Sequence, residues 1–217
     1  MKETVVFVHG LYMTGLELAL LRLRVGHAGF ETHQINYHTV LEPVRANAAR
    51  LAEYIAGLKA KTLHLVGHSL GGLVILRMLE SGAQVPPGRV VLLGAPVKGS
   101  LAARNLVAKH LGWILGRSGP DGLAEEYDPK WSGQRELGVI AGTGGFGLNP
   151  LRPDLPEPHD GLVAVEETRL AGATDYTEIK TTHTGLLFNP EVAELTVAFL
   201  RTGKFLYINK ENVSGEI

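Results

Sequence analysis

Short apolar runs alternate with longer stretches of helical periodicity in the first half of the chain. The short runs predict strands, and they cover Val5–Val8, Glu31–Tyr37, Thr62–Val66 and Arg89–Leu93. Between them apolar residues recur at helical spacing, which predicts helices over Leu16–Val25, Pro43–Leu58 and Leu70–Leu79. This order of elements favours a parallel sheet covered by helices.

A segment that is longer than an ordinary strand-to-helix connection follows, from Gly94 to Gln134. It contains an amphipathic stretch, Leu101–Leu115, which predicts one helix. We expect residues 97–136 to form a cap or lid inserted over the edge of the sheet. One apolar face is typical both of a mobile lid and of a fixed, packed helix, and we favour the fixed helix.

The remainder of the chain returns to strand and helix patterns. Strands are expected at Leu137–Ile140 and Tyr176–Lys180, a glycine- and proline-rich loop at Gly142–Pro158, a closing helix at Pro190–Leu200, and a tail after Thr202. No repeat or linker divides the sequence. The predicted fold is therefore one α/β domain over residues 1–217, a three-layer α/β/α sandwich whose mostly or wholly parallel sheet has about six strands.

Composition and charge narrow the choice of partners. The chain has 217 residues, 45% of them hydrophobic, and a formal net charge of -1 without a basic cluster, which argues against a nucleic-acid partner. It has no cysteine, so disulfides and thiol chemistry are excluded. We expect a cytoplasmic protein because the residues before the first strand are too few for a secretory signal, and no run is long enough to span a membrane. Contact with a membrane surface and the oligomeric state stay open.

The segment Gly67–Gly71 has the pattern Gly-x-Ser-x-Gly, between an apolar strand and a helix-like stretch. A nucleophilic serine at a sharp strand-to-helix turn needs that context, because the glycines let neighbouring backbones approach closely. We therefore interpret Ser69 as the nucleophile of a catalytic triad.

A serine hydroxyl needs a base within hydrogen-bond reach and a third group that orients the base. Of the nine histidines, His183 directly follows the last predicted strand, at the sheet edge where Ser69 is expected. Asp160 lies between serine and histidine in chain order and after an earlier strand, so we assign it as the orienting carboxylate. Asp154 and Glu166 are the alternatives.

The negative oxygen of a tetrahedral intermediate requires preorganised donors, typically two backbone N–H groups. One belongs to the residue after the nucleophile, here Leu70, and the second comes from the loop after the first strand, where we assign Leu11. Tyr12 is the alternative second donor. We interpret His9 as a residue that stabilises this turn, and His64 and His68 as packing residues.

These motifs together resemble the α/β-hydrolase superfamily, particularly small bacterial lipases and esterases that lack the first two strands of the fold, and more loosely the hydrolases similar to GPI-inositol deacylases. The resemblance covers most of the chain. It rests on four motifs in the family's order, Val8-His9-Gly10, Gly67–Gly71, Asp160-Gly161-x-Val163 and His183-x-Gly185. One departure is the long segment between Pro96 and Glu136, where minimal lipases have little.

The resemblance implies hydrolysis of carboxylic esters through an acyl-enzyme intermediate, with a small-molecule or lipid-like acyl ester as substrate. Acyl transfer or thioester hydrolysis on the same fold is one alternative, and a non-catalytic binding protein that retains the fold is another. The intact set of nucleophile, base and acid argues against the binding protein.

Cofactor and metal sites are not expected. Residues 142–147 spell the dinucleotide pattern Gly-x-Gly-x-x-Gly, but the prolines that follow prevent a helix from starting there to meet a pyrophosphate. The histidines lack the spacing of zinc ligands. We therefore expect neither a bound cofactor nor a catalytic metal.

Overall fold

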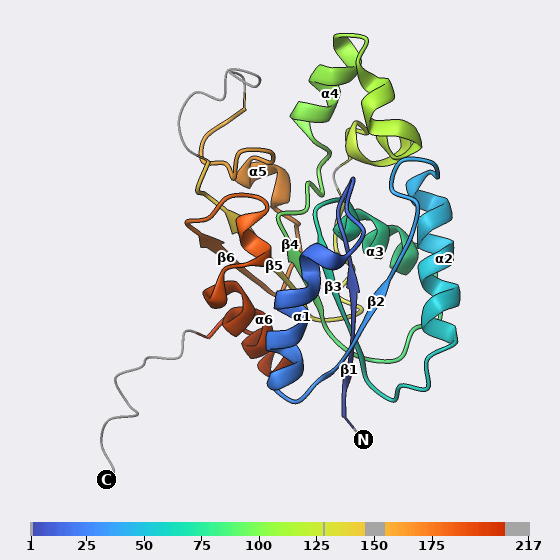
Figure 1. Ribbon diagram of the computed structural model, residues 1–217, viewed down its shortest axis with the longest axis vertical. Coiled ribbons are helices and arrows are strands. Elements are labelled where there is room, and N and C mark those ends of the chain that lie inside the picture. Colours follow the sequence, from blue (N-terminus) through green and yellow to red (C-terminus); the bar gives the residue numbers. More distant parts are fainter. Residues whose placement is uncertain (1, 128, 146–154, 207–217) are drawn as a thin grey trace.

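A six-stranded sheet, parallel throughout, runs through the centre of the protein (Figure 1). The computed structural model describes residues 2–127, 129–145 and 155–206. The strand order is β2-β1-β3-β4-β5-β6. The strands are β1 (Thr4–Val8), β2 (Glu31–Ile35), β3 (Leu63–His68), β4 (Val90–Leu93), β5 (Leu137–Gly142) and β6 (Asp175–Ile179).

Helices cover both faces of this sheet. Those that pack on it or follow its strands are α1 (Ala19–His27), α2 (Val44–Ala56), α3 (Leu70–Glu80), α5 (Val165–Thr168) and α6 (Pro190–Thr202). Alternate residues of β1 point to opposite sides: Val6 and Val8 join the apolar cluster beneath α2 and α3, whereas Val5 and Phe7 join the cluster beneath α1 and α6. The predicted three-layer α/β/α sandwich is confirmed.

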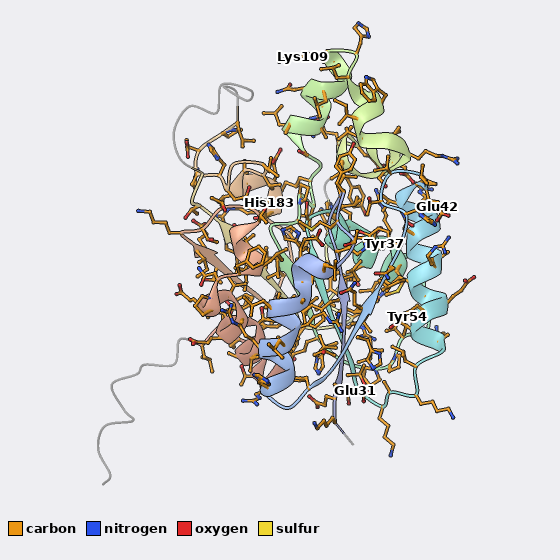
Figure 2. The ribbon with its side chains drawn as sticks, in the orientation of Figure 1. Glu31, Tyr37, Glu42, Tyr54, Lys109 and His183 are labelled. Atoms are coloured by element: carbon orange, nitrogen blue, oxygen red, sulfur yellow. The ribbon has the colours of Figure 1, made fainter. Side chains whose placement is uncertain are left out.

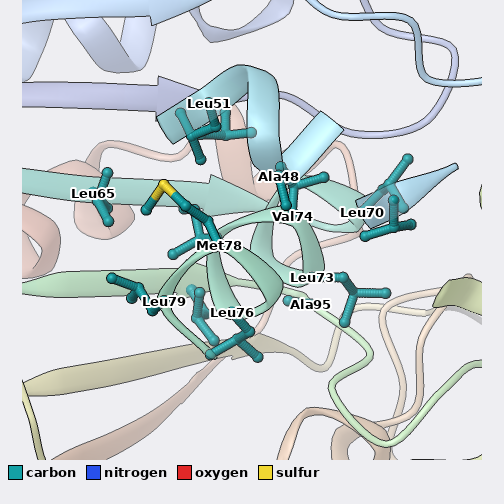
Figure 3. Packing of buried hydrophobic residues seen from close by; sticks show 14 of the residues in the cluster. Ala48, Leu51, Leu65, Leu70, Leu73, Val74, Leu76, Met78, Leu79 and Ala95 are labelled. Carbon is teal, nitrogen blue, oxygen red and sulfur yellow. The ribbon is translucent and has the colours of Figure 1, made fainter. Parts of the chain in front are cut away.

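Helix α3 is apolar almost all the way round because it lies between the sheet and α2. Figure 3 shows Val74 and Met78 of α3 beside Ala48 and Leu51 of α2, with Leu65 of β3 nearby. Each of these five side chains is almost completely buried. Truncation of a buried leucine of this kind costs about 2–5 kcal/mol of stability, so this packing holds the start of α3 firmly in place.

The structure differs from the sequence prediction at several boundaries. Strand β3 continues two residues past the predicted end at Val66, so that it stops directly before Ser69. The 3₁₀ turn η1 (Leu16–Leu18) precedes α1, and the 3₁₀ turn η4 (Gly185–Leu187) precedes α6. The short helix α5 was not predicted.

The segment above the carboxyl ends of the strands is built from short pieces (Figure 1). They are α4 (Leu101–Ala108), the 3₁₀ stretch η2 (Gly112–Ser118) and one π-helical turn, η3 (Gly119–Leu123). The expectation of one helix over Leu101–Leu115 is wrong, because the chain turns at His110, whose φ is 59°. Gly112 follows this turn, and glycine is a poor helix former.

Hydrogen bonds fasten the base of this segment to the rest of the protein. The Arg117 N–H donates to the Val40 carbonyl at 2.8 Å, and the Val44 N–H donates to an Asp121 carboxylate oxygen at 3.1 Å. That residues 97–136 act as a cap over the site stays a prediction. Among the described residues, no helix combines the length and apolar character needed to cross a membrane.

The turn between β3 and α3 requires close backbone approaches. A Cβ atom on Gly71 would lie 2.1 Å from the Val8 carbonyl oxygen, and one on Gly67 would lie 2.8 Å from the Gly72 backbone. Both contacts are shorter than any real Cβ contact, so only glycine allows α3 to start this close to the end of β1.

Gly71→Ala is therefore expected to destabilise the protein by about 1–3 kcal/mol, the usual cost of overpacking. Urea denaturation measures the free energy of unfolding. The matched control is Gly26→Ala in α1, whose Cβ would meet nothing closer than 3.9 Å and which should not lose stability. Equal stability of Gly71→Ala and the native protein would contradict the proposed packing.

Candidate active site

Ser69 lies at the tip of the turn between β3 and α3. Its backbone has φ 53° and ψ -124°, a left-handed φ that is costly for a residue other than glycine. The Ser69 N–H donates to the Leu93 carbonyl at 2.9 Å, and the Ser69 carbonyl accepts from the Gly72 N–H at 2.9 Å. These bonds and the glycine contacts hold the strained residue, which lines a cavity at the carboxyl ends of the strands.

His183 and Asp160 form a buried pair beside the same cavity. The Nδ1 atom of His183 and the Oδ2 atom of Asp160 are 2.6 Å apart, and the two residues are only 5% and 2% exposed. His183 follows β6 and lines the cavity with Ser69; in Figure 2 it lies among the segments at the carboxyl ends of the strands. The parallel sheet thus brings together three residues that are far apart in the sequence.

The Asp160 carboxylate is held by its own loop. Its second oxygen, Oδ1, accepts hydrogen bonds from the N–H groups of Leu162 at 2.9 Å and Val163 at 2.8 Å. The Asp160 carbonyl in turn accepts from the His183 N–H at 2.9 Å. The pair is therefore joined through both backbone and side chain, which fixes the direction of the imidazole ring.

Two glycines leave room for this pair, a role that no motif in the sequence indicated. A Cβ on Gly94 would lie 3.2 Å from both Asp160 Oδ2 and His183 Nδ1, and one on Gly142 would lie 2.7 Å from the Asp160 Cβ. Gly142 is also the first residue of the rejected dinucleotide pattern. Crowding by Asp160 explains why this position is a glycine. The last residues of that pattern lie outside the described residues.

The alternative carboxylate Glu166 is not found at this site. Glu166 is exposed and pairs with Lys98 and Arg169. Asp154 lies outside the described residues. Within the described residues there is no group of three or more His, Cys, Asp or Glu side chains that could hold a metal ion.

The two expected oxyanion donors lie in the turn that carries Ser69 and in the loop after β1. Leu70 is the first residue of α3, and the first N–H groups of a helix have no acceptor within the helix. Leu11 lines the cavity in the loop after β1. The N–H of the alternative donor, Tyr12, donates to the Thr39 hydroxyl at 3.2 Å and is thereby occupied.

Aromatic packing fixes the loop that carries Leu11. The Tyr37 ring stacks on His9 with the ring centroids 4.3 Å apart, and the Tyr37 hydroxyl donates to the His9 carbonyl. Burial raises the pKa of Tyr37, so its hydroxyl stays protonated as a donor. The His9 Nδ1 atom lies 3.1 Å from the Gly10 carbonyl, as expected for a histidine that stabilises this turn.

The cavity has a volume of about 310 Å³ and apolar walls. The segment above the sheet supplies much of the wall through residues of α4, η2 and η3, namely Ala102, Ala103, Leu106, Ile114, Leu115 and Leu123. In the described part of the chain, no Asp, Glu, Lys or Arg side chain lines the cavity.

A second link between this segment and the site was missed in the sequence. The buried Glu167 carboxylate, in α5, accepts hydrogen bonds from the Leu101 N–H at 2.5 Å and the Ala164 N–H at 2.8 Å. It therefore ties the start of α4 to the chain that leaves the Asp160 loop. The short α5 has too few residues for a helical pattern to reveal it.

His68 packs directly beneath His183. Its Nε2 atom lies 3.1 Å from the His183 carbonyl oxygen, and the two ring centroids are 4.7 Å apart. Because a carbonyl only accepts, Nε2 carries the proton. Burial lowers the pKa of His68 well below its usual value, and the neighbouring His183 lowers it further. His68 is thus a neutral packing residue that also holds the His183 backbone.

A histidine whose pKa is lower in the folded than in the unfolded state binds fewer protons when folded. Stability is then complete above the unfolded pKa of about 6.5 and is lost as the pH falls below it. Burial lowers the pKa of His9 and of His64 in the same direction. We predict that the free energy of unfolding, measured by urea denaturation, falls between pH 7 and pH 5.

The His68→Gln variant keeps an N–H donor but removes one titrating group. Its stability should fall less steeply with decreasing pH, by up to about 1.4 kcal/mol per pH unit. His27 is exposed on α1, and His27→Gln serves as the control with the native slope. Identical slopes for His68→Gln and the native protein would refute a neutral, buried His68.

Comparisons with known proteins identify the family of this chain. The family model described as "Alpha/beta hydrolase family" matches residues 5–203. No curated protein matches the sequence significantly. Among solved structures, a Bacillus licheniformis lipase in mature form is similar at 21% identity and a TM-score of 0.65, covering 93% of this chain and 92% of that one.

Two further structures have the same fold. A metagenomic carboxyl esterase has 19% identity and a TM-score of 0.61 over 83% of this chain and 64% of that one. Polyneuridine aldehyde esterase has 14% identity and a TM-score of 0.60 over 93% of this chain and 100% of that one. With the family model spanning nearly the whole sequence, this chain belongs to the alpha/beta hydrolase family.

Proposed function

We propose that this protein is a serine hydrolase that cleaves carboxylic esters, with Ser69, His183 and Asp160 as its catalytic triad. One observation carries the proposal: a strained turn presents Ser69 to the cavity that His183 also lines, and a buried Asp160 binds His183 from behind. A strained residue of this kind costs free energy and persists where the surrounding structure requires it, which is common at reacting groups.

The tautomer that this hydrogen bond favours suits His183 as a base. Its Nδ1–H donates to the Asp160 carboxylate, so the lone pair resides on Nε2. In the proposed mechanism Nε2 removes the Ser69 proton as Oγ attacks the ester carbonyl. The leaving alkoxide takes that proton from His183, and the product is an acyl-enzyme. Water then attacks the acyl group, His183 again accepts and returns a proton, and the carboxylic acid leaves.

Each tetrahedral intermediate carries a negative oxygen. The amides of Leu70 and Leu11 are the proposed donors to that oxygen, one from the start of α3 and one from the loop after β1. The N-terminus of α3 adds the positive end of a helix dipole to the same place. Removal of a single donor from such a site typically costs about 2.7–4 kcal/mol of transition-state stabilisation.

The substrate class follows from the cavity. The described residues give the cavity apolar walls without charged side chains, which suit an uncharged acyl chain, and about 310 Å³ holds on the order of ten water-sized groups. The solved structures described as a lipase and as esterases support the choice of an ester. We therefore propose a small-molecule or lipid-like acyl ester as substrate.

A fluorophosphonate probe tests the nucleophile, because it reacts only with an activated serine. We predict that it labels the native protein and that the label resides on the peptide containing Ser69. The Ser69→Ala variant should not be labelled. Failure of the native protein to react would favour a non-catalytic binding protein of the same fold.

Exchange of the proposed orienting carboxylate for an amide tests the triad. Asp160→Asn is expected to lower kcat towards a p-nitrophenyl ester by about 10³–10⁴-fold with little change in KM, because the imidazole is held in the wrong tautomer. Glu166→Gln and Asp154→Asn are the controls and should retain activity. An Asp160→Asn enzyme with near-native kcat would overturn this assignment.

A further inference from the structure

Tyr12 bridges two walls of the catalytic cavity. It follows the proposed donor Leu11 in the loop after β1, and it lines the cavity. Its hydroxyl donates to the carbonyl of Ile114, a cavity residue in η2 of the segment above the strands. Its N–H donates to the Thr39 hydroxyl in the loop after β2, at 3.2 Å. The side chain of Tyr12 therefore reaches from the loop after β1 to the segment above the sheet.

The position of Tyr12 is fixed at a conformational cost. Its φ is 59°, a left-handed value that residues other than glycine rarely adopt. Such a conformation persists where the surrounding structure requires it, and here the bonds to Thr39 and Ile114 hold it. Tyr12 is also 61% exposed although it lines the cavity. The residue is therefore a thin wall, with the cavity on one side and solvent on the other.

The strand order places Tyr12 and His183 on opposite sides of Ser69. In the sheet, β1 lies on one side of β3, whereas β4, β5 and β6 lie on the other. Tyr12 comes from the loop after β1, Ser69 from the turn after β3 and His183 from the loop after β6. Thr184, the residue after His183, also lines the cavity. The cavity thus has a β1 side with Tyr12 and a β6 side with His183.

The stretch η2 covers the β1 side of the cavity. The Arg117 N–H, in η2, donates to the Val40 carbonyl at 2.8 Å. Val40 lies in the loop after β2, and β2 is the neighbour of β1 in the sheet. Ile114 and Leu115 of η2 line the cavity. Together with Tyr12 they give the β1 side apolar walls.

The proposed mechanism decides which half of an ester lies on each side. His183 must donate a proton to the oxygen of the leaving alcohol, so the alcohol lies on the β6 side. The carbonyl oxygen faces the amides of Leu11 and Leu70. The acyl chain is left with the β1 side, towards Tyr12 and Ile114.

We propose that Tyr12 determines the length of the acyl chain that the site accepts. A chain that extends from Ser69 along the β1 side meets the Tyr12 ring and its bond to Ile114, and a longer chain has to displace them. The cavity of about 310 Å³ holds on the order of ten methylene-sized groups, shared between the acyl and alcohol parts. Acyl chains of roughly four to eight carbons therefore fit best. This inference rests on the proposed ester hydrolysis and adds a residue that controls its substrate range.

Hydrolysis of p-nitrophenyl esters from acetate to laurate measures the length preference. The variant is Tyr12→Gly, because glycine adopts a left-handed φ without strain and does not force the loop that carries Leu11 into another shape. Each further methylene that finds apolar contact gains roughly fourfold in kcat/KM. We expect the ratio of kcat/KM for laurate to that for butyrate to rise at least about tenfold in Tyr12→Gly. An unchanged ratio would overturn the inference.

Two further variants control for a general disturbance of the site. Trp113 is an aromatic residue of η2 that is 75% exposed and is not among the described residues that line the cavity, so Trp113→Ala should keep the native ratio. A shift as large as that of Tyr12→Gly would contradict a specific role of Tyr12. Ile114→Phe narrows the β1 side and should move the preference towards shorter chains, which tests the inference even if Tyr12→Gly folds poorly. A native ratio in Ile114→Phe would contradict an acyl chain on that side.

The Tyr12→Phe variant tests the bond to Ile114, because it keeps the ring and loses the hydroxyl. We expect its ratio to rise, but by less than in Tyr12→Gly. A native ratio would show that the ring limits the chain without the bond, and would overturn the bridge.

The outcomes separate this inference from the proposed function. A native protein that cleaves none of these esters would refute both. An active native enzyme whose ratio is unchanged in Tyr12→Gly and in Ile114→Phe would refute the role of Tyr12 alone.

Discussion

The close packing of the Gly67–Gly71 turn against the end of β1 is the constraint on which the site depends. Gly71 lies so near the Val8 carbonyl that α3 can start only if this position lacks a side chain. The same contact holds Ser69 at a positive φ, an unfavourable conformation for serine. The cost is offset by the burial of α3 between the sheet and α2, where nearly every residue of the helix is buried.

The parallel sheet brings the other residues of the site to this strained turn. All six strands point the same way, so the loops after β1, β3, β5 and β6 open at one edge. Leu11, Ser69, Asp160 and His183 come from those four loops, and Gly94 after β4 leaves the space in which the last two meet. The backbone bond from the His183 N–H to the Asp160 carbonyl then helps to hold the pair in place without a substrate.

The parts of the fold that local pattern determines could be predicted from the sequence. Apolar runs located the strands, and the Gly-x-Ser-x-Gly turn, with strand before and helix after, located Ser69. His183 and Asp160 followed because chain order and strand ends limit where partners of Ser69 can lie. The structure brings these residues together, and their catalytic roles remain predictions.

Features that depend on contacts between residues far apart in the sequence could not be predicted from local pattern. The break at His110 interrupts an apolar pattern that continues into η2, so periodicity suggested one helix where there are two pieces. The roles of Gly94 and Gly142 depend on where Asp160 arrives from another part of the chain. Glu167 looks like a surface residue of a short polar stretch until the start of α4 is seen to bind it.

The most direct test of the central claim is mass spectrometry of the protein quenched with acid during turnover of a p-nitrophenyl ester. We predict that a fraction of the protein gains the mass of one acyl group, located on the peptide that contains Ser69. The adduct should disappear once the substrate is exhausted. An acyl group on a different residue, or turnover by a protein in which Ser69 is replaced with alanine, would contradict the claim.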